Sequence, residues 1–139
     1  MLFYYDYTYW MMLLPVLLIT IYAQAKVSSN FNKYSRITNR RYLTGAQAAE
    51  AVLRQHGIYD VRIERVAGKL TDHYDPRTNV IRLSSSVYDS PTIAAVGVAA
   101  HEAGHAVQYA VGYGPIRLRS ALIPVTQVGS QFGIVLLFL

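Results

Sequence analysis

The sequence contains no cysteine and few charged residues. Without cysteine there is no disulfide framework, no thiolate nucleophile and no Cys-ligated zinc, so any transition-metal site must use histidine and carboxylates. Only 15% of its 139 residues are charged, below the usual ~25%, while 53% are hydrophobic. This balance excludes a disordered chain and favours a membrane protein.

Acidic residues are scarcer than basic ones. The chain has 8 Asp and Glu against 13 Lys and Arg, a net charge of +5. No arginine–aromatic pattern or nucleic-acid module accompanies this charge, so we expect no nucleic-acid partner. The basic residues instead flank two apolar segments.

The first apolar segment covers residues 10–25, with tyrosines and Trp10 crowding its front edge. Aromatic rings of this kind favour the headgroup level of a bilayer. The tripeptide at 23–25 resembles a signal-peptidase site, but the first nine residues lack the basic n-region of a signal peptide. We therefore expect residues 1–26 to be an uncleaved transmembrane anchor, with a cleaved signal peptide as the alternative.

The second apolar segment, residues 121–139, carries no charge and is long enough for nearly a full crossing. We expect residues 115–139 to be a second transmembrane segment. Because the sequence stops within this apolar run, we also expect it to be a C-terminally truncated fragment of a longer protein. Basic residues follow the first segment and precede the second, so the positive-inside rule predicts a multi-pass protein of the cell membrane with its core on the cytoplasmic side.

Residues 27–114 have the composition of a folded core with both helices and strands. Thr44 and Gln47 are spaced as a capping box, and Gly57 supplies a stop, which predicts a helix between them. Residues 60–66 alternate between apolar and charged side chains, as a half-buried strand does.

A turn at residues 75–77 separates two further strand-like stretches, and we expect the strand at 79–83 to form the sheet edge where a substrate backbone adds. The fold class expected for the chain is thus α+β.

A second helix is predicted over residues 91–111. Ser90 is expected as its N-cap and Pro91 as its first residue. Its small apolar composition predicts burial on most sides, and close packing would offset the cost of Gly97 and Gly104.

This helix contains the sequence His101-Glu102-Ala103-Gly104-His105, an H-E-x-x-H pattern. Two histidines four residues apart project from one helical face and can bind one Zn²⁺. Glu102 adjoins the first ligand and can act as general base and then general acid on metal-activated water. We therefore expect His101 and His105 to be metal ligands and Glu102 to be catalytic.

A catalytic zinc usually takes a third protein ligand, and the sequence leaves its source open. No His, Asp or Glu occurs in residues 106–139. The ligand would come from upstream or from beyond the end of the sequence. The upstream candidates are Asp72, His73, Asp75 and Asp89. His73 is the best of them chemically, as a ligand or a substrate contact.

The block Leu-Thr-Asp-His-Tyr-Asp-Pro at 70–76 and the segment Val-Ala-Ala-His-Glu-Ala-Gly-His-Ala-Val-Gln at 98–108 resemble the bacterial YugP-type membrane neutral zinc metallopeptidases. The resemblance extends over nearly the whole chain, including the tyrosine-rich anchor. It implies a zincin-like core between transmembrane helices, zinc held by His101 and His105, and a catalytic Glu102. It also implies a longer protein, in which a later acidic stretch supplies the third ligand.

The function expected from these observations is zinc-dependent hydrolysis of peptide bonds at the membrane, with peptides or proteins as substrates and lipid as surroundings. The alternative is a non-catalytic membrane scaffold whose zinc is structural. A closed site with four protein ligands would favour the scaffold, and a site open to water would favour the enzyme.

Overall fold

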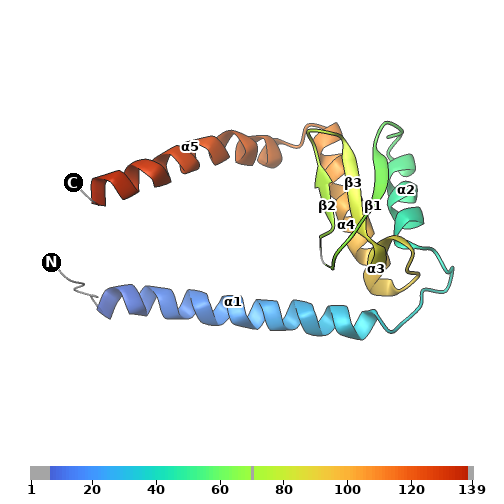
Figure 1. Ribbon diagram of the computed structural model, residues 1–139, viewed down its shortest axis with the longest axis horizontal. Helices are drawn as coiled ribbons and strands as arrows, with labels where there is room; N and C mark the ends of the chain where they lie inside the picture. The colour runs from blue at the N-terminus through green and yellow to red at the C-terminus, as the bar shows by residue number, and fades with distance from the viewer. Residues whose placement is uncertain (1–6, 70, 138–139) are drawn as a thin grey trace.

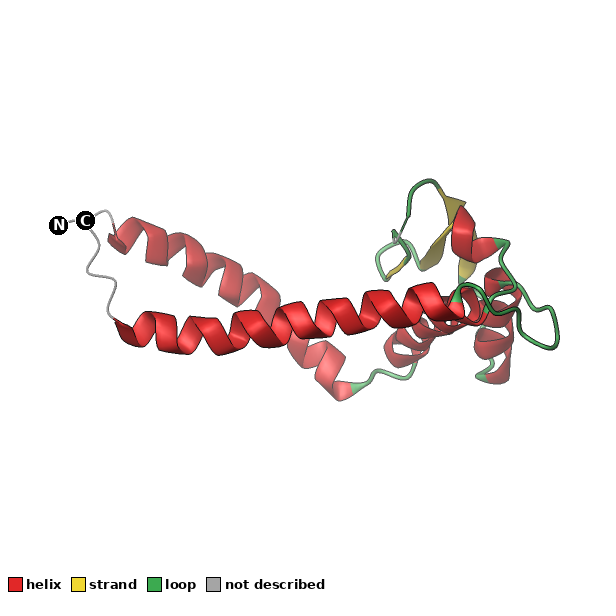
Figure 2. Ribbon diagram, turned by 90° about the horizontal axis from the view of Figure 1, so that it is seen from below, coloured by secondary structure: helices red, strands yellow, loops and turns green. Residues whose placement is uncertain are grey.

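The computed structural model describes residues 7–69 and 71–137 and consists of a small core that joins two long helices. Helix α1 (Tyr7–Tyr34) leads into the core, and helix α5 (Gly114–Leu137) leaves it. Both extend from the same side of the core in the same general direction (Figures 1 and 2).

The core contains a mixed three-stranded sheet in the order β1-β3-β2. Strand β1 (Arg62–Val66) runs parallel to β3 (Val80–Ser84), and β2 (His73–Asp75) pairs antiparallel with β3 through a hairpin. The expected half-buried strand and the expected turn at 75–77 are confirmed.

The expectation that residues 79–83 form the sheet edge is wrong. Strand β3 is central, and β2 is the edge strand that contacts the helix carrying the histidines. The sequence of β3 explains this position, because Val80, Ile81 and Leu83 are all fully buried. A nearly continuous apolar run is typical of a strand covered on both sides.

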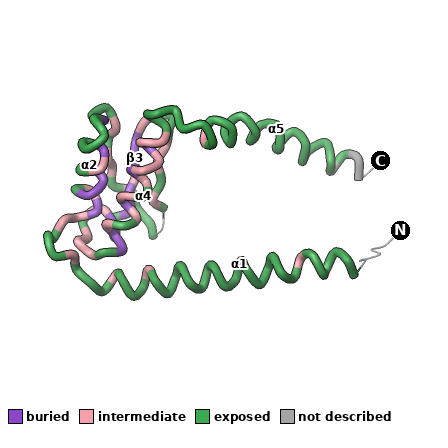
Figure 3. Tube along the Cα trace, turned by 180° about the vertical axis from the view of Figure 1, so that it is seen from behind, coloured by how far each residue is buried: buried purple, intermediate pink, exposed green. Residues whose placement is uncertain are grey.

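Helices α2 (Gly45–Gln55) and α4 (Ile93–Ala110) pack on each other and on the sheet, while the short α3 (Ser85–Tyr88) follows β3. Helix α2 has the predicted capping box between Thr44 and Gln47, and Gly57 has a φ of 69° just after the helix. The core lies between these helices and β3, and burial is concentrated there (Figure 3).

Helix α4 approaches its neighbours closely because the face that it buries consists of alanines. These are Ala94, Ala95, Ala99, Ala103 and Ala106. Burial on most sides, as the sequence suggested, is wrong, since Gly97 and His101 are exposed. The expectation that Gly97 and Gly104 pack closely against a neighbour is also wrong. In the described part of the chain, a Cβ on either glycine would meet nothing within 4 Å outside its own helical segment.

The N-terminus of α4 also differs from the sequence expectation. Thr92, not Ser90, is the N-cap, and its side chain accepts a hydrogen bond from the Ala95 amide at 3.3 Å. Pro91 precedes the helix because its carbonyl is used elsewhere. It accepts bonds from the backbone and side-chain nitrogens of Asn39 in the linker after α1, at 2.9 and 2.6 Å.

Helix α1 is long and apolar enough to cross a membrane, and it alone passes that test within residues 7–69 and 71–137. None of its residues is buried, so large apolar side chains such as Leu18 and Ile19 stand exposed. At 1.5 Å per residue its 28 residues extend about 42 Å, more than the ~30 Å hydrocarbon core of a bilayer.

Helix α5 begins directly after a turn at Gly112, whose φ is 65°. It exposes apolar residues such as Leu122 and Phe132. By length and apolar composition, however, it does not qualify as a membrane-spanning helix, whereas α1 does. A second membrane crossing therefore stays a prediction, and residues 138 and 139 of the predicted segment lie outside the described residues.

Candidate metal centre

The two histidines of the H-E-x-x-H pattern lie side by side on the exposed side of α4. Their Nε2 atoms are 3.2 Å apart, and their rings meet edge to face with centroids 4.6 Å apart. One helical turn separates residues i and i+4, so α4 itself brings the imidazoles together.

This geometry fits a shared zinc ion. If each Nε2 bound the metal at the usual 2.0–2.1 Å, a separation of 3.2 Å would give an N–Zn–N angle of about 100–106°, close to tetrahedral. The residues present thus satisfy the distance requirement for two of the protein ligands.

Gln108 holds the ring of His105 in an orientation suited to metal binding. The Gln108 side-chain oxygen lies 3.1 Å from His105 Nδ1. Because an amide oxygen only accepts, Nδ1 must carry the proton, and in the neutral ring Nε2 is left with its lone pair. Partners of this kind orient the histidine ligands of metal sites.

Glu102 on α4 is hydrogen-bonded to the edge strand of the sheet. Its Oε2 accepts a hydrogen bond from the backbone N–H of Tyr74 at 3.1 Å. Tyr74 belongs to β2, so this bond joins the edge strand to α4 and fixes the carboxylate beside both.

Tyr74 is itself fixed by its side chain. Its hydroxyl donates to Asn79 at 2.8 Å, and its ring packs edge to face on Tyr109 with centroids 5.6 Å apart. Burial, with the negative charge of Asp60, raises the pKa of Tyr74 above its ordinary value. The hydroxyl therefore keeps its proton at neutral pH and remains a donor.

Among the residues that the structure describes, no third ligand lies with the two histidines. Within residues 7–69 and 71–137, no group of three or more His, Asp or Glu side chains could hold a metal ion. His73 Nδ1 is 2.7 Å from the carbonyl of Thr71, and the Asp72 carboxylate accepts bonds from the amide and hydroxyl of Ser84.

The other two upstream candidates also have partners of their own. Asp75 accepts from the Arg77 amide at 2.9 Å and binds Arg82 at 3.1 Å, while Asp89 pairs with Arg65 at 2.7 Å. Ligation by His73 stays a prediction.

Two residues of this centre escaped the sequence analysis. Tyr74 contributes a backbone N–H, which no residue type encodes, and its place next to Glu102 depends on strand pairing. Gln108 was detectable in principle, because it follows His105 by three residues and so faces it on the same helix.

Comparison with known proteins gives two matches. A family model described as "Putative neutral zinc metallopeptidase" matches residues 9–139. The "Putative membrane protease YugP" of Bacillus subtilis (strain 168) is 46% identical over 112 residues, which are 81% of this chain and 50% of that protein. The chain thus spans about half the length of this curated relative. No solved structure matches this chain.

Proposed function

Since the chain belongs to this family of neutral zinc metallopeptidases, we propose that it hydrolyses peptide bonds at a membrane, with His101 and His105 as zinc ligands and Glu102 as the proton-transferring residue. The observation that carries the proposal is the pair of Nε2 atoms 3.2 Å apart beside a carboxylate that the edge strand holds in place.

When bound, zinc would polarise the substrate carbonyl and make water a stronger nucleophile. Glu102 removes a proton from the attacking water and later gives it to the leaving amine. Because Tyr74 holds Oε2, we assign the proton transfer to Oε1. The exposure of His101 leaves substrate and water access to this side of α4.

The substrate backbone is proposed to lie along β2. The Tyr74 N–H bonds to Glu102 on α4, so this residue's amide points away from β3 and toward the outer edge of the sheet. An extended peptide that followed this edge would pass directly beside Glu102, with the Tyr74 N–H still bonded to the Glu102 carboxylate.

We propose that α1 and α5 both cross the membrane and that the core is cytoplasmic. The two helices leave the core in the same direction, as two crossings of one bilayer require (Figure 2). Lys26 and Lys33 in α1, and Arg117 and Arg119 in α5, lie near the core ends of these helices, which the positive-inside rule places in the cytoplasm.

A third ligand completes the proposed site. Two sources remain, namely His73 after a local rearrangement or a residue of a segment corresponding to the rest of the longer relative. The whole protein's activity and substrates are part of the proposal.

The test is a measurement of zinc content and of peptide cleavage by the protein in detergent or lipid. We expect about one zinc per chain, cleavage of some members of a broad peptide panel, and loss of cleavage on chelation. X-ray absorption on the zinc-loaded protein counts the protein ligands of the zinc and so distinguishes the peptidase from the non-catalytic scaffold. Four protein ligands with no cleavage of any peptide would contradict the enzyme and support the scaffold.

A further inference from the structure

A groove of about 450 Å³ lies between α1 and α4 and reaches the proposed catalytic residues. Its wall on α4 includes His101 and Glu102. Its wall on α1 consists of Val27, Asn30, Phe31 and Tyr34. The four α1 positions have the spacing i, i+3, i+4 and i+7, so they share one face of the helix.

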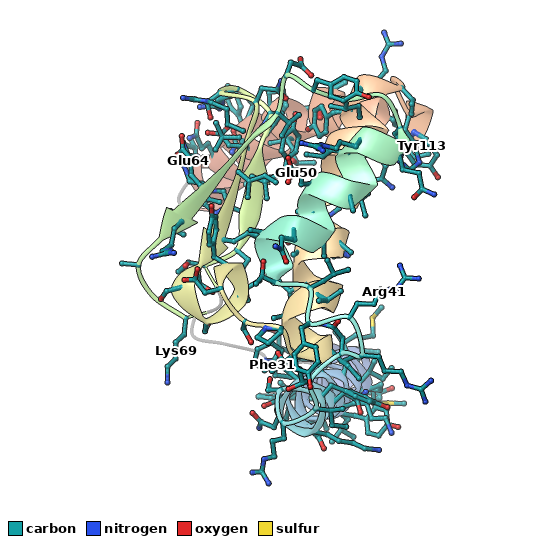
Figure 4. The ribbon with its side chains drawn as sticks, turned by 90° about the vertical axis from the view of Figure 1, so that its right-hand side faces the viewer. Phe31, Arg41, Glu50, Glu64, Lys69 and Tyr113 are labelled. Atoms are coloured by element: carbon teal, nitrogen blue, oxygen red, sulfur yellow. The ribbon has the colours of Figure 1, made fainter. Side chains whose placement is uncertain are left out.

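The groove is mainly apolar except at the end where the catalytic residues lie. Phe31 is half-buried at the junction of α1 with the core (Figure 4). Ile93 and Val98 extend the apolar lining along α4. Anything that fills this groove would lie against Glu102, and this continuity indicates that the occupant is part of the substrate.

The α1 wall is fixed to α4 by the linker between α1 and α2. Thr38 forms a β-bridge with Thr92, and the Ile93 amide donates to the Ile37 carbonyl at 2.8 Å. These contacts hold the end of α1 beside the first turn of α4.

Gly97 keeps the groove open. It lines the groove one helical turn before His101, and a Cβ at this position would meet nothing within 4 Å outside the helix's own neighbouring residues. Packing therefore does not account for a glycine here, although glycine costs about 1 kcal/mol relative to alanine inside a helix. A large side chain at 97 would project into the space next to the catalytic residues.

If α1 crosses the membrane as proposed, the wall also has a defined height above the bilayer. The 20 residues from Tyr7 to Lys26 make about 30 Å of helix, the thickness of the hydrocarbon core. Residues 27–34 then extend about 12 Å further, so with Tyr7–Lys26 in the bilayer the groove would lie just outside it.

We propose that this groove binds a bulky apolar side chain of the substrate next to the scissile bond, and that the anchor helix α1 forms one wall of the substrate site. The proposal rests on the peptidase function proposed above. It makes α1 a specificity element as well as a tether, and it names the substrate class as peptide segments with a large apolar residue, presented close to the membrane surface.

The first test is a graded series at Gly97, with cleavage profiled on a peptide library that varies the residues flanking the scissile bond. Gly97→Ala adds only one methyl group to the groove and should change the profile much less than a large side chain does. Gly97→Phe should lower kcat/KM at least about tenfold for peptides with Leu or Phe beside the cleaved bond and much less for those with Ala. Ser29→Phe adds the same bulk to an exposed position of α1 outside the groove. It should change kcat/KM for neither group of peptides.

The second test does not depend on turnover and uses the absence of cysteine in the chain. In the Glu102→Gln variant, a cysteine placed at Asn30 carries a polarity-sensitive dye, and a control carries it at Ser29. A leucine-containing peptide should shift the emission of the dye at position 30 but not at position 29, and a serine-containing peptide should shift neither.

The outcomes separate the two proposals. Cleavage without apolar preference, and unchanged by Gly97→Phe, would overturn the groove assignment while leaving the peptidase intact. A leucine-dependent dye shift in a protein that cleaves no peptide would overturn the peptidase and retain the groove as a peptide site. A shift produced by lipid vesicles alone, and insensitive to peptide, would assign the groove to lipid and overturn this inference.

Discussion

The backbone N–H of Tyr74 donates to Glu102 Oε2 at 3.1 Å, across 28 positions in the sequence. This bond connects the edge of the sheet to the helix that carries both histidines. It holds the carboxylate without contributing any charge, so Glu102 can still accept a proton.

Replacing Glu102 by Gln should therefore remove chemistry and preserve structure. The Gln side chain retains an oxygen that can accept the Tyr74 N–H, but it cannot take up a proton. We expect hydrolysis to fall by at least the ~10²–10⁴ typical of general acid–base catalysis, with zinc content nearly unchanged. Peptide cleavage and zinc content are measured on the same preparations. Equal cleavage by wild type and Glu102→Gln would contradict the assigned mechanism.

Removal of either histidine should abolish stoichiometric zinc binding. His101→Ala and His105→Ala each leave one imidazole on α4, which is too few for a stable site. Elemental analysis after dialysis measures the effect, and His56→Ala is the matched control. His56 lies at the end of α2, where its ring contacts the Val52 carbonyl at 2.9 Å. Full zinc retention by the double variant of His101 and His105 would rule out this site.

Gln108→Ala should weaken zinc binding without destroying the site. Loss of a partner that orients a metal ligand typically costs 10–100-fold in metal affinity or activity, and Gln108 makes this contact with His105 Nδ1. A competition titration with a zinc chelator measures the change. Gln108→Glu should recover most of the affinity, because a carboxylate also accepts from Nδ1. An affinity for zinc equal to that of wild type in Gln108→Ala would show that the contact does not orient the ring.

The juxtaposition of the two histidines was predictable from sequence because it is local. His101, Glu102 and His105 lie on one turn and a half of a helix, and the 3.6-residue period alone brings the two imidazoles together. The capping box at Thr44 and the stop at Gly57 were predictable for the same reason.

What the sequence could not predict depends on pairing between distant segments. The position of β3 at the centre of the sheet follows from its parallel pairing with β1, and the contact of Tyr74 with Glu102 follows from β2 lying at the edge. The displaced start of α4 has the same origin, because Asn39 of the linker engages the Pro91 carbonyl and Thr92 becomes the cap.

Acid should destabilise the hairpin through Asp75. The Arg77 amide, followed by the Thr78 and Arg82 side chains, lowers the pKa of Asp75 from 3.8 to about 2. A carboxyl group with a lowered folded-state pKa stabilises the fold above its unfolded pKa, and this contribution is lost as the pH falls from about 4 to about 2. Asp75→Asn should be less stable than wild type at pH 6, and the difference should shrink toward pH 2. Denaturant unfolding at several pH values measures it, and a constant difference would contradict this role.

Two glycine-to-alanine substitutions should have opposite effects on stability. A Cβ at Gly45 would collide with the backbone carbonyl of Val87, so Gly45→Ala should cost about 1–3 kcal/mol through overpacking. A Cβ at Gly97 meets open space, so Gly97→Ala should gain up to ~1 kcal/mol from helix propensity. Thermal unfolding in detergent compares the two, and stabilisation by Gly45→Ala would contradict the packing of α2 on α3.

The orientation in the membrane can be tested on the same cysteine-free background. Arg54 on α2 and Arg77 in the β2–β3 turn are both exposed, so a cysteine at either position would be accessible to a reagent on its own side of the membrane. If the basic flanks of α1 and α5 keep the core in the cytoplasm, both cysteines should resist an impermeant thiol reagent in intact cells and react after lysis. A cysteine at Thr8, near the other end of α1, should react before lysis. Labelling of positions 54 and 77 in intact cells would reverse the proposed orientation. If α1 were also missing from the mature protein, the signal-peptide alternative would replace the anchor.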